Sequence, residues 1–374
     1  MTAAARPEPG PGEESPYLAD DQPGRRPPVP DIPHAAANGE PLLKVRDLHV
    51  TFLRRGRRPV AAVDGIDLVV APGQSVGLVG ESGSGKSVTA LAIMGLLPRR
   101  RTVALTGSVR LSGRELIGLP VPELRRLRGR DMAMVFQDPM SSLNPVLTVG
   151  RQVTEVLERH TKLRGPAAEE EAARLLDAVG IPDGRRRLRS YPHQLSGGMR
   201  QRVMIAMALA CKPRLLIADE PTTALDVTIQ AQILDLLRRL VVDSETALVI
   251  ITHDLGVVAG MCDTVHVLYS GRIVESAARR DLFGEPRHPY TAGLLASVPR
   301  LDTTRGQPLH PIAGSPLDTI PWPRGCAFSP RCPRRVERCL GAPPPLVSAD
   351  AGHALRCMNP VPSATVGERG EVPV

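Results

Sequence analysis

The chain has 374 residues, of which 42% are hydrophobic and 23% are charged, a composition typical of a globular protein with one large domain or two ordinary ones. Its nine aromatic residues (one Trp, four Tyr and four Phe) argue against a base-stacking surface for single-stranded nucleic acid, and no apolar run approaches the roughly 18 residues of a membrane-spanning helix. The formal charge of +8 fits either a solvated basic surface or a position beside an anionic membrane.

The N-terminal end of the chain shows no sign of an ordered or exported segment. Residues 1–41 are rich in Pro, Gly and acidic residues and have no hydrophobic periodicity, so we expect a disordered tail there. The apolar stretch of a secretory signal is missing, and we therefore expect a cytosolic chain whose six cysteines form no structural disulfides. The first strand is predicted at 42–50, where apolar and polar residues alternate.

Residues 42–284 have the pattern of strands that alternate with helices. Short apolar runs predict buried strands at 75–79, 132–136, 215–218 and 247–251. Helical patterns separate them, most clearly at 86–97 and 227–240. This alternation predicts an α/β fold with a largely parallel sheet covered on both faces. Residues 138–195 are expected to form a helical insertion, and residues 285–374 a Pro- and Cys-rich extension.

A glycine-rich phosphate-binding motif lies between the predicted strand at 75–79 and the helix that follows it. The sequence Gly80-Glu81-Ser82-Gly83-Ser84-Gly85-Lys86-Ser87 fits G-x-x-x-x-G-K-[ST]. Its glycines allow backbone N–H groups to converge on phosphate oxygens, and the helix N-terminus adds partial positive charge. Lys86 is expected to bind the β- and γ-phosphates, and the Ser87 hydroxyl to ligate Mg²⁺. The residues expected to contact ATP here are Gly80, Glu81, Ser82, Gly83, Ser84, Gly85, Lys86, Ser87 and Val88.

Two adjacent carboxylates, Asp219 and Glu220, follow the predicted strand at 215–218. At the end of a parallel strand, a carboxylate can complete the ligand shell of a magnesium ion bound to the phosphates. We expect Asp219 to take this role. We expect Glu220 to orient and polarise the attacking water as a general base.

A second Gly-rich motif lies at residues 195–202. Leu195-Ser196-Gly197-Gly198-Met199-Arg200-Gln201-Arg202 resembles the signature motif of ABC-type ATPases. In that family, Ser196, Gly197 and Gly198 would complete the nucleotide site of the opposite subunit, so hydrolysis would need a dimer. The resemblance implies a P-loop NTPase fold of the α/β class with an ABC-type helical subdomain, plus a small Cys- and Pro-rich C-terminal extension.

Four further residues match family motifs in the same order along the chain. Gln137 resembles the Q-loop glutamine, which senses Mg²⁺ and γ-phosphate, and His253 resembles the switch histidine that contacts γ-phosphate. Asp226, in Ala224-Leu225-Asp226, resembles the D-loop aspartate. Phe52 resembles the aromatic residue that stacks on adenine, although a core phenylalanine is an alternative. The resemblance therefore implies a hydrolysis-competent site with Glu220, His253, Lys86 and Gln137 as catalytic residues and Ser87, Gln137 and Asp219 around Mg²⁺.

Other segments indicate the subfamily. The sequences Gln137-Asp138-Pro139-Met140-Ser141-Ser142-Leu143-Asn144-Pro145, Tyr191-Pro192-His193-Gln194 and His288-Pro289-Tyr290-Thr291 resemble the ATPase subunits of dipeptide, oligopeptide or nickel importers. The resemblance implies an ATPase at the cytoplasmic face of the membrane, bound peripherally. Its partners would be two transmembrane permease subunits, a second ATPase subunit (a copy or a paralogue) and, through the transporter, an extracytoplasmic substrate-binding protein.

Two other classes of function remain as alternatives. A soluble ABC-type ATPase acting on nucleic acid or the ribosome fits the positive charge, but the single cassette and the importer-like segment after Gln137 argue against it, and no nucleic acid is expected as a partner. An exporter subunit ordinarily has a different Q-loop environment or fused membrane spans.

The C-terminal extension contains four of the six cysteines, Cys326, Cys332, Cys339 and Cys357, with the spacing C-x5-C-x6-C-x17-C. Four thiolates suit Zn²⁺ or an iron–sulfur cluster, and free thiols are a third possibility. The spacing lacks the C-x2-C pair of zinc ribbons, and the resemblance to peptide-importer ATPases implies a [4Fe–4S] cluster. The other two cysteines, Cys211 and Cys262, are expected to be small buried hydrophobic residues.

Overall fold

The computed structural model describes residues 40–53, 56, 58–98, 102–223, 225–297, 312–315, 325–350 and 352–362. Residues 1–39 of the predicted tail and Ala224 of the D-loop segment lie outside these ranges. Within them, no helix is both long enough and apolar enough to span a bilayer.

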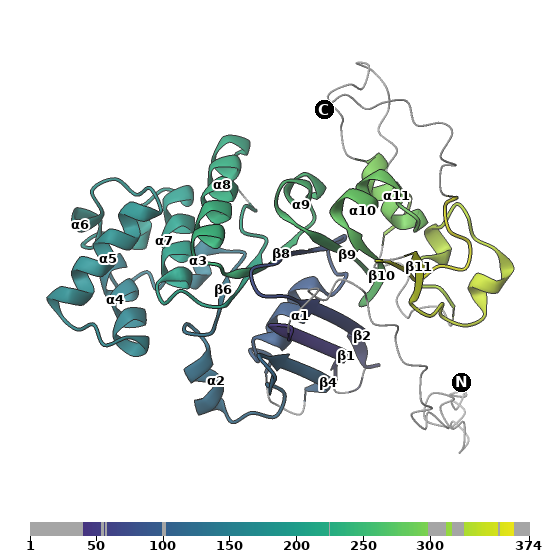
Figure 1. Cartoon of the computed structure of the whole chain (residues 1–374), viewed down its shortest axis with the longest axis horizontal. Helices are drawn as coiled ribbons and strands as arrows, with labels where there is room; N and C mark the ends of the chain where they lie inside the picture. The colour runs from purple at the N-terminus through teal and green to yellow at the C-terminus, as the bar shows by residue number, and fades with distance from the viewer. Residues whose placement is uncertain are drawn as a thin grey trace, which may run out of the picture. The chain divides into compact units, whose positions relative to one another are not determined.

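The centre of the fold is an eight-stranded mixed sheet (Figure 1). In spatial order its strands are β11 (Val347–Asp350), β12 (His353–Leu355), β10 (Arg272–Ala278), β9 (Thr264–Tyr269), β3 (Ser75–Val79), β8 (Ala247–Thr252), β7 (Leu215–Asp219) and β6 (Met132–Val135). The five strands from β9 to β6 are parallel, whereas β10, β12 and β11 are antiparallel. Every residue of β7, β8 and β9 is buried, as expected for parallel strands covered on both faces. The predicted α/β class is confirmed.

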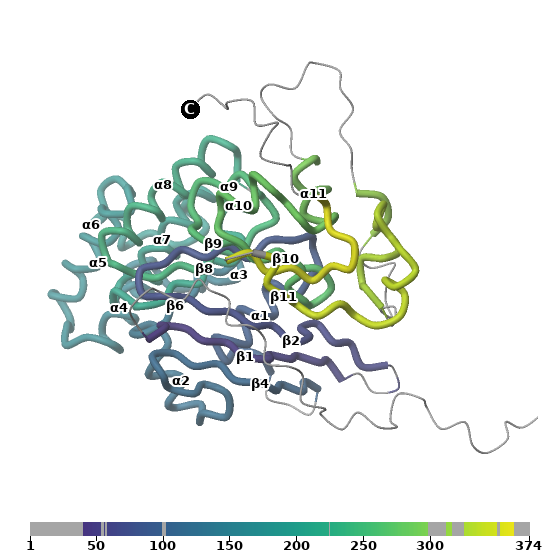
Figure 2. The backbone as a smooth tube through the Cα atoms, turned by 45° about the vertical axis from the view of Figure 1, so that its right-hand side comes forward, coloured from purple at the N-terminus to yellow at the C-terminus, as the bar shows by residue number. Residues whose placement is uncertain are grey.

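One face of this sheet packs on helices and the other on a second sheet. Alternate residues of each central strand enter two different core clusters, so that Leu216 and Ala218 of β7 belong to one and Leu215 and Ile217 to the other. The first cluster contains helices α7 (Gly197–Leu209), α8 (Val227–Asp243) and α9 (Leu255–Met261). The second contains helix α1 (Lys86–Ile93) and the antiparallel sheet, which Figure 2 shows beneath the large one. The sequence pattern predicts covered faces but not this second sheet.

The second sheet has four antiparallel strands in the order β2 (Val60–Val70), β1 (Leu43–Phe52), β4 (Val103–Leu111) and β5 (Arg114–Glu115). Of these, only β1 is predicted from the sequence, and its alternating pattern buries Leu43, Val45 and Val50. Helix α2 (Val121–Leu127) follows β5 and leads to β6.

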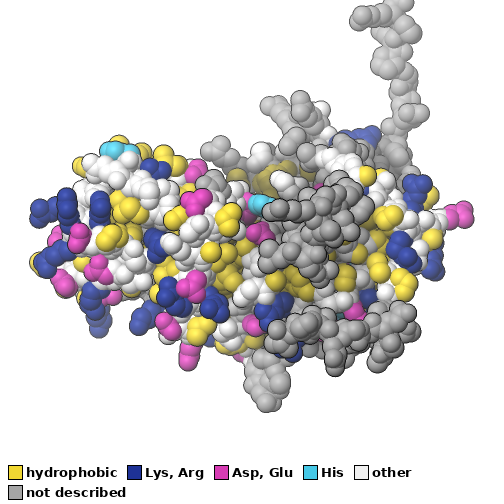
Figure 3. Space-filling model, turned by 90° about the horizontal axis from the view of Figure 1, so that it is seen from above, with side chains coloured by type: hydrophobic (Ala, Val, Ile, Leu, Met, Phe, Trp, Pro, Cys, Tyr) yellow, Lys and Arg dark blue, Asp and Glu magenta, His cyan; other side chains and the backbone are white. Residues whose placement is uncertain are grey.

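Short helices fill the chain between β6 and β7. They are α3 (Pro139–Ser142), α4 (Val149–His160), α5 (Pro166–Ala178), α6 (Gly184–Arg187) and η1 (Pro192–Gln194), followed by α7. Side chains cap several of these helices. Asp138 accepts a hydrogen bond from the Met140 N–H at the start of α3, and Thr148 accepts one from Arg151 at the start of α4. Basic side chains gather at the end formed by α4 to α6 (Figure 3), where Arg174, Arg185, Arg186 and Arg189 are exposed.

The C-terminal residues extend the large sheet. After β10 the chain forms α10 (Arg279–Gly284), α11 (Pro289–Ala296), η3 (Ser329–Arg331) and η4 (Glu337–Leu340). Strand β12 then pairs with β10. The carboxylate of Glu275 in β10 is fully buried and accepts hydrogen bonds from His353 (2.7 Å) and from the N–H groups of Arg287 (2.6 Å) and His288 (3.0 Å). A segment with few apolar residues is thus held to the rest of the large sheet by strand pairing and a buried acid.

A histidine between two carboxylates gives the antiparallel sheet a testable pH dependence. His49 of β1 lies 3.2 Å from the Asp64 carboxylate and 2.9 Å from that of Asp47. Hydrogen bonding to Asp64, reinforced by Asp47, raises the pKa of His49 above its ordinary value of 6.5. Protonated His49 therefore stabilises the folded state through its contacts with the two carboxylates. This contribution is complete below pH 6.5 and is lost as the pH rises through the pKa of His49 in the folded state.

We expect His49→Gln to lower the free energy of unfolding by about 1 kcal/mol in mildly acidic solution and by much less in alkaline solution. Denaturant unfolding of both proteins at two pH values measures this difference. An equal loss at both pH values would show that the effect comes from packing and not from charge.

Candidate active site

The phosphate-binding motif forms a tight loop between β3 and α1. Gly80, Gly83 and Gly85 have φ angles of 153°, 80° and 100°, a region that side chains disfavour. There is also no room for a side chain, since a Cβ at Gly80 would lie 2.2 Å from the Leu268 carbonyl oxygen and one at Gly85 would lie 2.4 Å from that of Ala62. The glycines of the motif are therefore required by the conformation of the loop and by its close packing against β9 and β2.

The amino group of Lys86 lies over this loop. It donates hydrogen bonds to the carbonyl oxygens of Gly80 (2.7 Å) and Glu81 (2.9 Å) and to Ser84 Oγ (3.3 Å), and the residue is only 4% exposed. Burial lowers the pKa of Lys86, and nearby carboxylates partly oppose this shift. The structure thus holds a largely buried cation at the centre of an anion-binding loop.

Ser87 and Asp219 form the pair of oxygen groups expected for a magnesium site. The Ser87 hydroxyl donates a hydrogen bond to Asp219 Oδ1 at 3.0 Å, which joins the first turn of α1 to the end of β7. Burial raises the pKa of Asp219, while the bond from Ser87 acts in the opposite direction. A hydroxyl and a partly buried carboxylate beside a phosphate loop are ligands that Mg²⁺ prefers, so the residues present fit this ion.

Side chains that follow three neighbouring parallel strands, β6, β7 and β8, come together at Glu220. Gln137, which follows β6, donates through Nε2 to Glu220 Oε2 at 2.9 Å, and His253, which follows β8, places Nδ1 3.4 Å from Oε1. Thr223 Oγ1 donates to Oε2 at 2.8 Å. The φ of Glu220 is 46°, in the left-handed region that few non-glycine residues adopt. The carboxylate is therefore held in one orientation by a locally strained backbone and three polar partners.

Other predicted site residues lie apart from this group. Ser196 caps α7 by accepting a hydrogen bond from the Met199 N–H, and Gly198 packs beside Ile229 of α8. Asp226 caps α8 and accepts from Ile229. Among the described residues, no hydrogen bond joins residues 196–198 to the phosphate loop, and their role at the site of another subunit stays a prediction. Phe52, at the end of β1, is half-buried against the core, so the structure places it in a packing contact and its role in adenine stacking stays a prediction.

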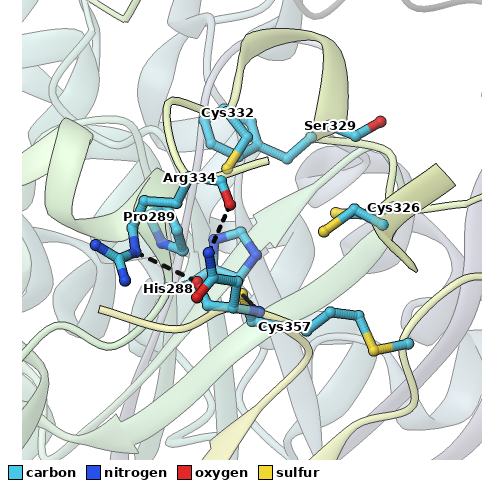
Figure 4. A pocket seen from close by; sticks show the side chains of 11 residues that line it. His288, Pro289, Cys326, Ser329, Cys332, Arg334 and Cys357 are labelled. Atoms are coloured by element: carbon cyan, nitrogen blue, oxygen red, sulfur yellow. Dashed lines mark hydrogen bonds between the residues drawn. The ribbon is translucent and has the colours of Figure 1, made fainter. Parts of the chain in front are cut away.

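The four cysteines of the extension lie around one small cavity of about 10 Å³, together with His288 and Phe328 (Figure 4). Burial raises the pKa of the thiols of Cys326, Cys332 and Cys357, the last to about 11. Tertiary packing thus brings together four cysteines that span 31 positions of the sequence, from Cys326 to Cys357. In the described part of the chain, however, no group of three or more His, Cys, Asp or Glu side chains is arranged to hold a metal ion. The predicted iron–sulfur or zinc site therefore lacks support from the geometry, although the donor set is complete.

The other two cysteines differ in exposure. Cys262 is buried, and burial raises its pKa to about 12, as expected for a small hydrophobic residue. Cys211 is only half-buried and is the less enclosed of the pair.

The sequence motifs assign no role at the site to three residues that contact it. Thr223 orients Glu220, and both Tyr290 and Arg331 contact Glu81. Tyr290 belongs to the segment 288–291, which resembles a subfamily motif and predicts no contact with the phosphate loop. No local pattern marks Arg331, because its partner lies 250 residues earlier in the chain.

Comparisons with known proteins agree with this geometry. A family model described as "ABC transporter" matches residues 63–223, and one described as "Oligopeptide/dipeptide transporter, C-terminal region" matches residues 274–339. The chain is 50% identical over 330 residues to the oligopeptide transport ATP-binding protein OppD of Escherichia coli, which covers 88% of this chain and 96% of that protein. It is 49% identical over 318 residues to the dipeptide transport ATP-binding protein DppD of Bacillus subtilis, with 85% of this chain and 94% of that protein covered.

The solved structures agree as well. A dimeric ATP-binding cassette in a post-hydrolysis state, bound to ADP and Pi, is 30% identical with a TM-score of 0.57, and the match covers 64% of this chain and 99% of that one. The phosphate loop, the converging Glu220 group and these relatives lead to one family. The chain belongs to the ABC-type ATPases that form the ATP-binding proteins of oligopeptide and dipeptide transporters.

Proposed function

We propose that the chain is the ATP-hydrolysing subunit that powers uptake of oligopeptides or dipeptides through partner membrane permeases. The observation that carries this proposal is the convergence of Gln137 and His253 on Glu220, next to the Lys86 loop and the Ser87–Asp219 pair. The names of the relatives favour peptides over nickel as the transported substrate.

The residues have distinct roles in the proposed hydrolysis. Backbone N–H groups within residues 80–87, other than that of Glu81, and the amino group of Lys86 bind the phosphates of ATP and stabilise the charge that develops on them. Glu220 accepts the proton of the attacking water, and Gln137 and Thr223 fix the direction of its carboxylate. His253 contacts the γ-phosphate. When bound, Mg²⁺ would be held by Ser87, Asp219 and Gln137 and would neutralise charge on the β- and γ-phosphates.

The proposed assembly contains two ATPase subunits. Ser196, Gly197 and Gly198 of one subunit complete the site of the other, which fits their separation from the phosphate loop and the dimeric state of the similar cassette. Residues 42–284 form the ATPase domain in this proposal, with the helical insertion at 138–195 facing the permeases. Residues 285–374 form the extension. The second subunit is a copy of this chain or a paralogue.

The chain is proposed to lie at the cytoplasmic face of the membrane as a peripheral subunit. Two transmembrane permeases convert ATP-driven closure of the dimer into transport, and an extracytoplasmic binding protein delivers the peptide. Affinity purification of the tagged chain from membranes, with co-expressed permeases, tests the assembly. We expect ATP hydrolysis by the reconstituted complex to rise when a peptide-loaded binding protein is added. Salt-sensitive binding to duplex DNA or to ribosomes, without permeases, would instead support the alternative ATPase class.

We also propose that the four cysteines hold a metal centre, with [4Fe–4S] favoured over Zn²⁺. Two observations support this: the four cysteines line one cavity, and three of them, Cys326, Cys332 and Cys339, lie in the segment 274–339 that the oligopeptide/dipeptide transporter C-terminal model matches. Iron, sulfide and zinc contents of anaerobically purified protein decide between the two metals. Protein free of all three would show that the cysteines are free thiols.

A further inference from the structure

The described part of the C-terminal extension forms hydrogen bonds with the phosphate loop at Glu81. Three groups of Glu81 are engaged at once. Its N–H donates to the Tyr290 hydroxyl at 2.9 Å, its carbonyl oxygen accepts from Lys86, and its carboxylate binds the Arg331 guanidinium. Arg331 and Tyr290 both lie beyond β10, so part of the support of the loop comes from outside the ATPase core.

The contact with Arg331 is a two-pronged ion pair. Nη1 lies 2.6 Å from Glu81 Oε2 and Nη2 lies 3.0 Å from Oε1, while the Arg331 side chain is only 4% exposed. The remaining donors are satisfied as well, by the carbonyl oxygens of Ala313 (2.8 Å) and Ile312 (3.3 Å) and by the Tyr269 hydroxyl (3.4 Å). The Arg331 guanidinium is buried with every donor satisfied, while the Glu81 side chain is 29% exposed. A two-pronged pair of this kind fixes the position of the carboxylate, and only the planar guanidinium offers both prongs.

An aromatic cluster keeps Arg331 and Tyr290 in place. Tyr269 of β9, Tyr290 of α11 and Phe328 before η3 are all buried, with ring centroids 4.7 to 5.3 Å apart in edge-on or tilted contacts. The Arg331 guanidinium lies 5.9 Å from the centre of the Tyr269 ring. The two residues that bind Glu81 are therefore held by packing between the extension and the parallel sheet.

We infer that Arg331 is a positioning residue for ATP binding, which acts through Glu81 from the C-terminal extension. By holding the carboxylate, Arg331 fixes the first turn of the loop, where the Glu81 carbonyl also orients Lys86. It also neutralises a negative charge beside the proposed triphosphate site. Without Arg331 the loop has to be ordered when ATP binds, and a free carboxylate repels the phosphates, so affinity falls.

The test is ATP affinity, measured by isothermal titration of the full-length chain with MgATP. We expect Arg331→Ala to raise the Kd about ten-fold, which corresponds to about 1.4 kcal/mol. Hydrolysis at saturating ATP should stay within about two-fold of wild type, since Glu220 and its partners are untouched, so KM changes and kcat does not. Arg331→Lys should recover only part of the affinity, because an ammonium cannot form both bonds.

Two further variants separate positioning from a general loss of stability. Arg338→Ala is the matched control, because Arg338 lies in the same segment and donates to the Met358 carbonyl oxygen at 2.8 Å, away from the loop. It should bind ATP as wild type does. Glu81→Gln breaks the same ion pair from the loop side and leaves the extension intact. The double variant Glu81→Gln/Arg331→Ala should bind ATP about as tightly as Arg331→Ala alone, because both changes remove the same ion pair.

Several outcomes would overturn the inference: unchanged affinity in Arg331→Ala, a loss of equal size in Arg338→Ala, or independent effects of the two partners. The inference rests on the proposed ATP site at residues 80–88, which the Lys86→Met variant tests separately. If Lys86→Met loses ATP binding but Arg331→Ala does not, only the role of Arg331 is wrong. If Lys86→Met binds ATP normally, the site itself is wrong.

Discussion

Glu220→Gln is expected to slow ATP hydrolysis by about a thousand-fold, within the range that loss of a general base produces. The amide has nearly the same shape as the carboxylate but cannot take a proton from water. Its oxygen can still accept hydrogen bonds from Gln137 or Thr223, so the site should remain folded and bind ATP. Steady-state phosphate release measures the rate, and size-exclusion chromatography with MgATP should show an accumulated dimer, because closure is no longer followed by hydrolysis.

The matched control for this variant is Glu245→Gln. Glu245 also has a positive φ, 52°, but it lies on the surface beyond α8. Loss of activity in Glu245→Gln would point to the backbone strain of such positions as the cause. Hydrolysis at the wild-type rate in Glu220→Gln would remove Glu220 as the base and leave His253 as the group to test.

Lys86→Met is expected to raise the Kd for ATP by at least about a hundred-fold, because charge-assisted hydrogen bonds to phosphate are lost from a residue that is only 4% exposed. Methionine keeps most of the length of the side chain, and the buried position tolerates an apolar group. The fold should therefore survive, since the lost bonds within the loop are made by one amino group. Equilibrium titration with MgATP measures the affinity, and circular dichroism checks the fold.

Lys162→Met is the corresponding control, because it removes the same charge from an exposed position after α4. It should bind ATP as wild type does. Similar affinities in Lys86→Met and wild type would contradict the proposed site. A loss of affinity together with a loss of helical signal would instead mean that the Lys86 bonds hold the loop together even without ATP.

The central strands could be predicted from sequence because each is a short apolar run of a length typical for strands. The runs at 215–218 and 247–251 differ by one residue from β7 and β8. Strands β2 and β4 are not predicted. Both are partly exposed and contain a glycine, Gly65 in β2 and Gly107 in β4, so neither shows a continuous apolar run. The helix predicted at 86–97 ends at Ile93, with Gly95 in a left-handed conformation two residues later.

Part of the candidate site can likewise be predicted from the sequence, and part of it cannot. Residues 80–87 are contiguous, and their backbone function follows from glycine spacing, so the phosphate loop is visible in the sequence. That Gln137 and His253 lie beside Glu220 follows in outline from parallel strands that end at one edge of a sheet. Which atoms meet does not follow, because the Gln137–Glu220 contact spans 83 residues and depends on the order of β6, β7 and β8.

The sequence by itself therefore determined the family, the α/β class and the phosphate-binding loop, because these depend on local periodicity and on motifs whose residues are adjacent. Only the tertiary structure decided that four cysteines share one cavity and that Arg331 holds Glu81. Both arrangements require the extension to pack against β9 and β10, and the energy of that packing is spread over strand pairing, buried rings and one buried acid. Contacts of this kind join residues up to 250 positions apart and leave no periodic trace in the chain.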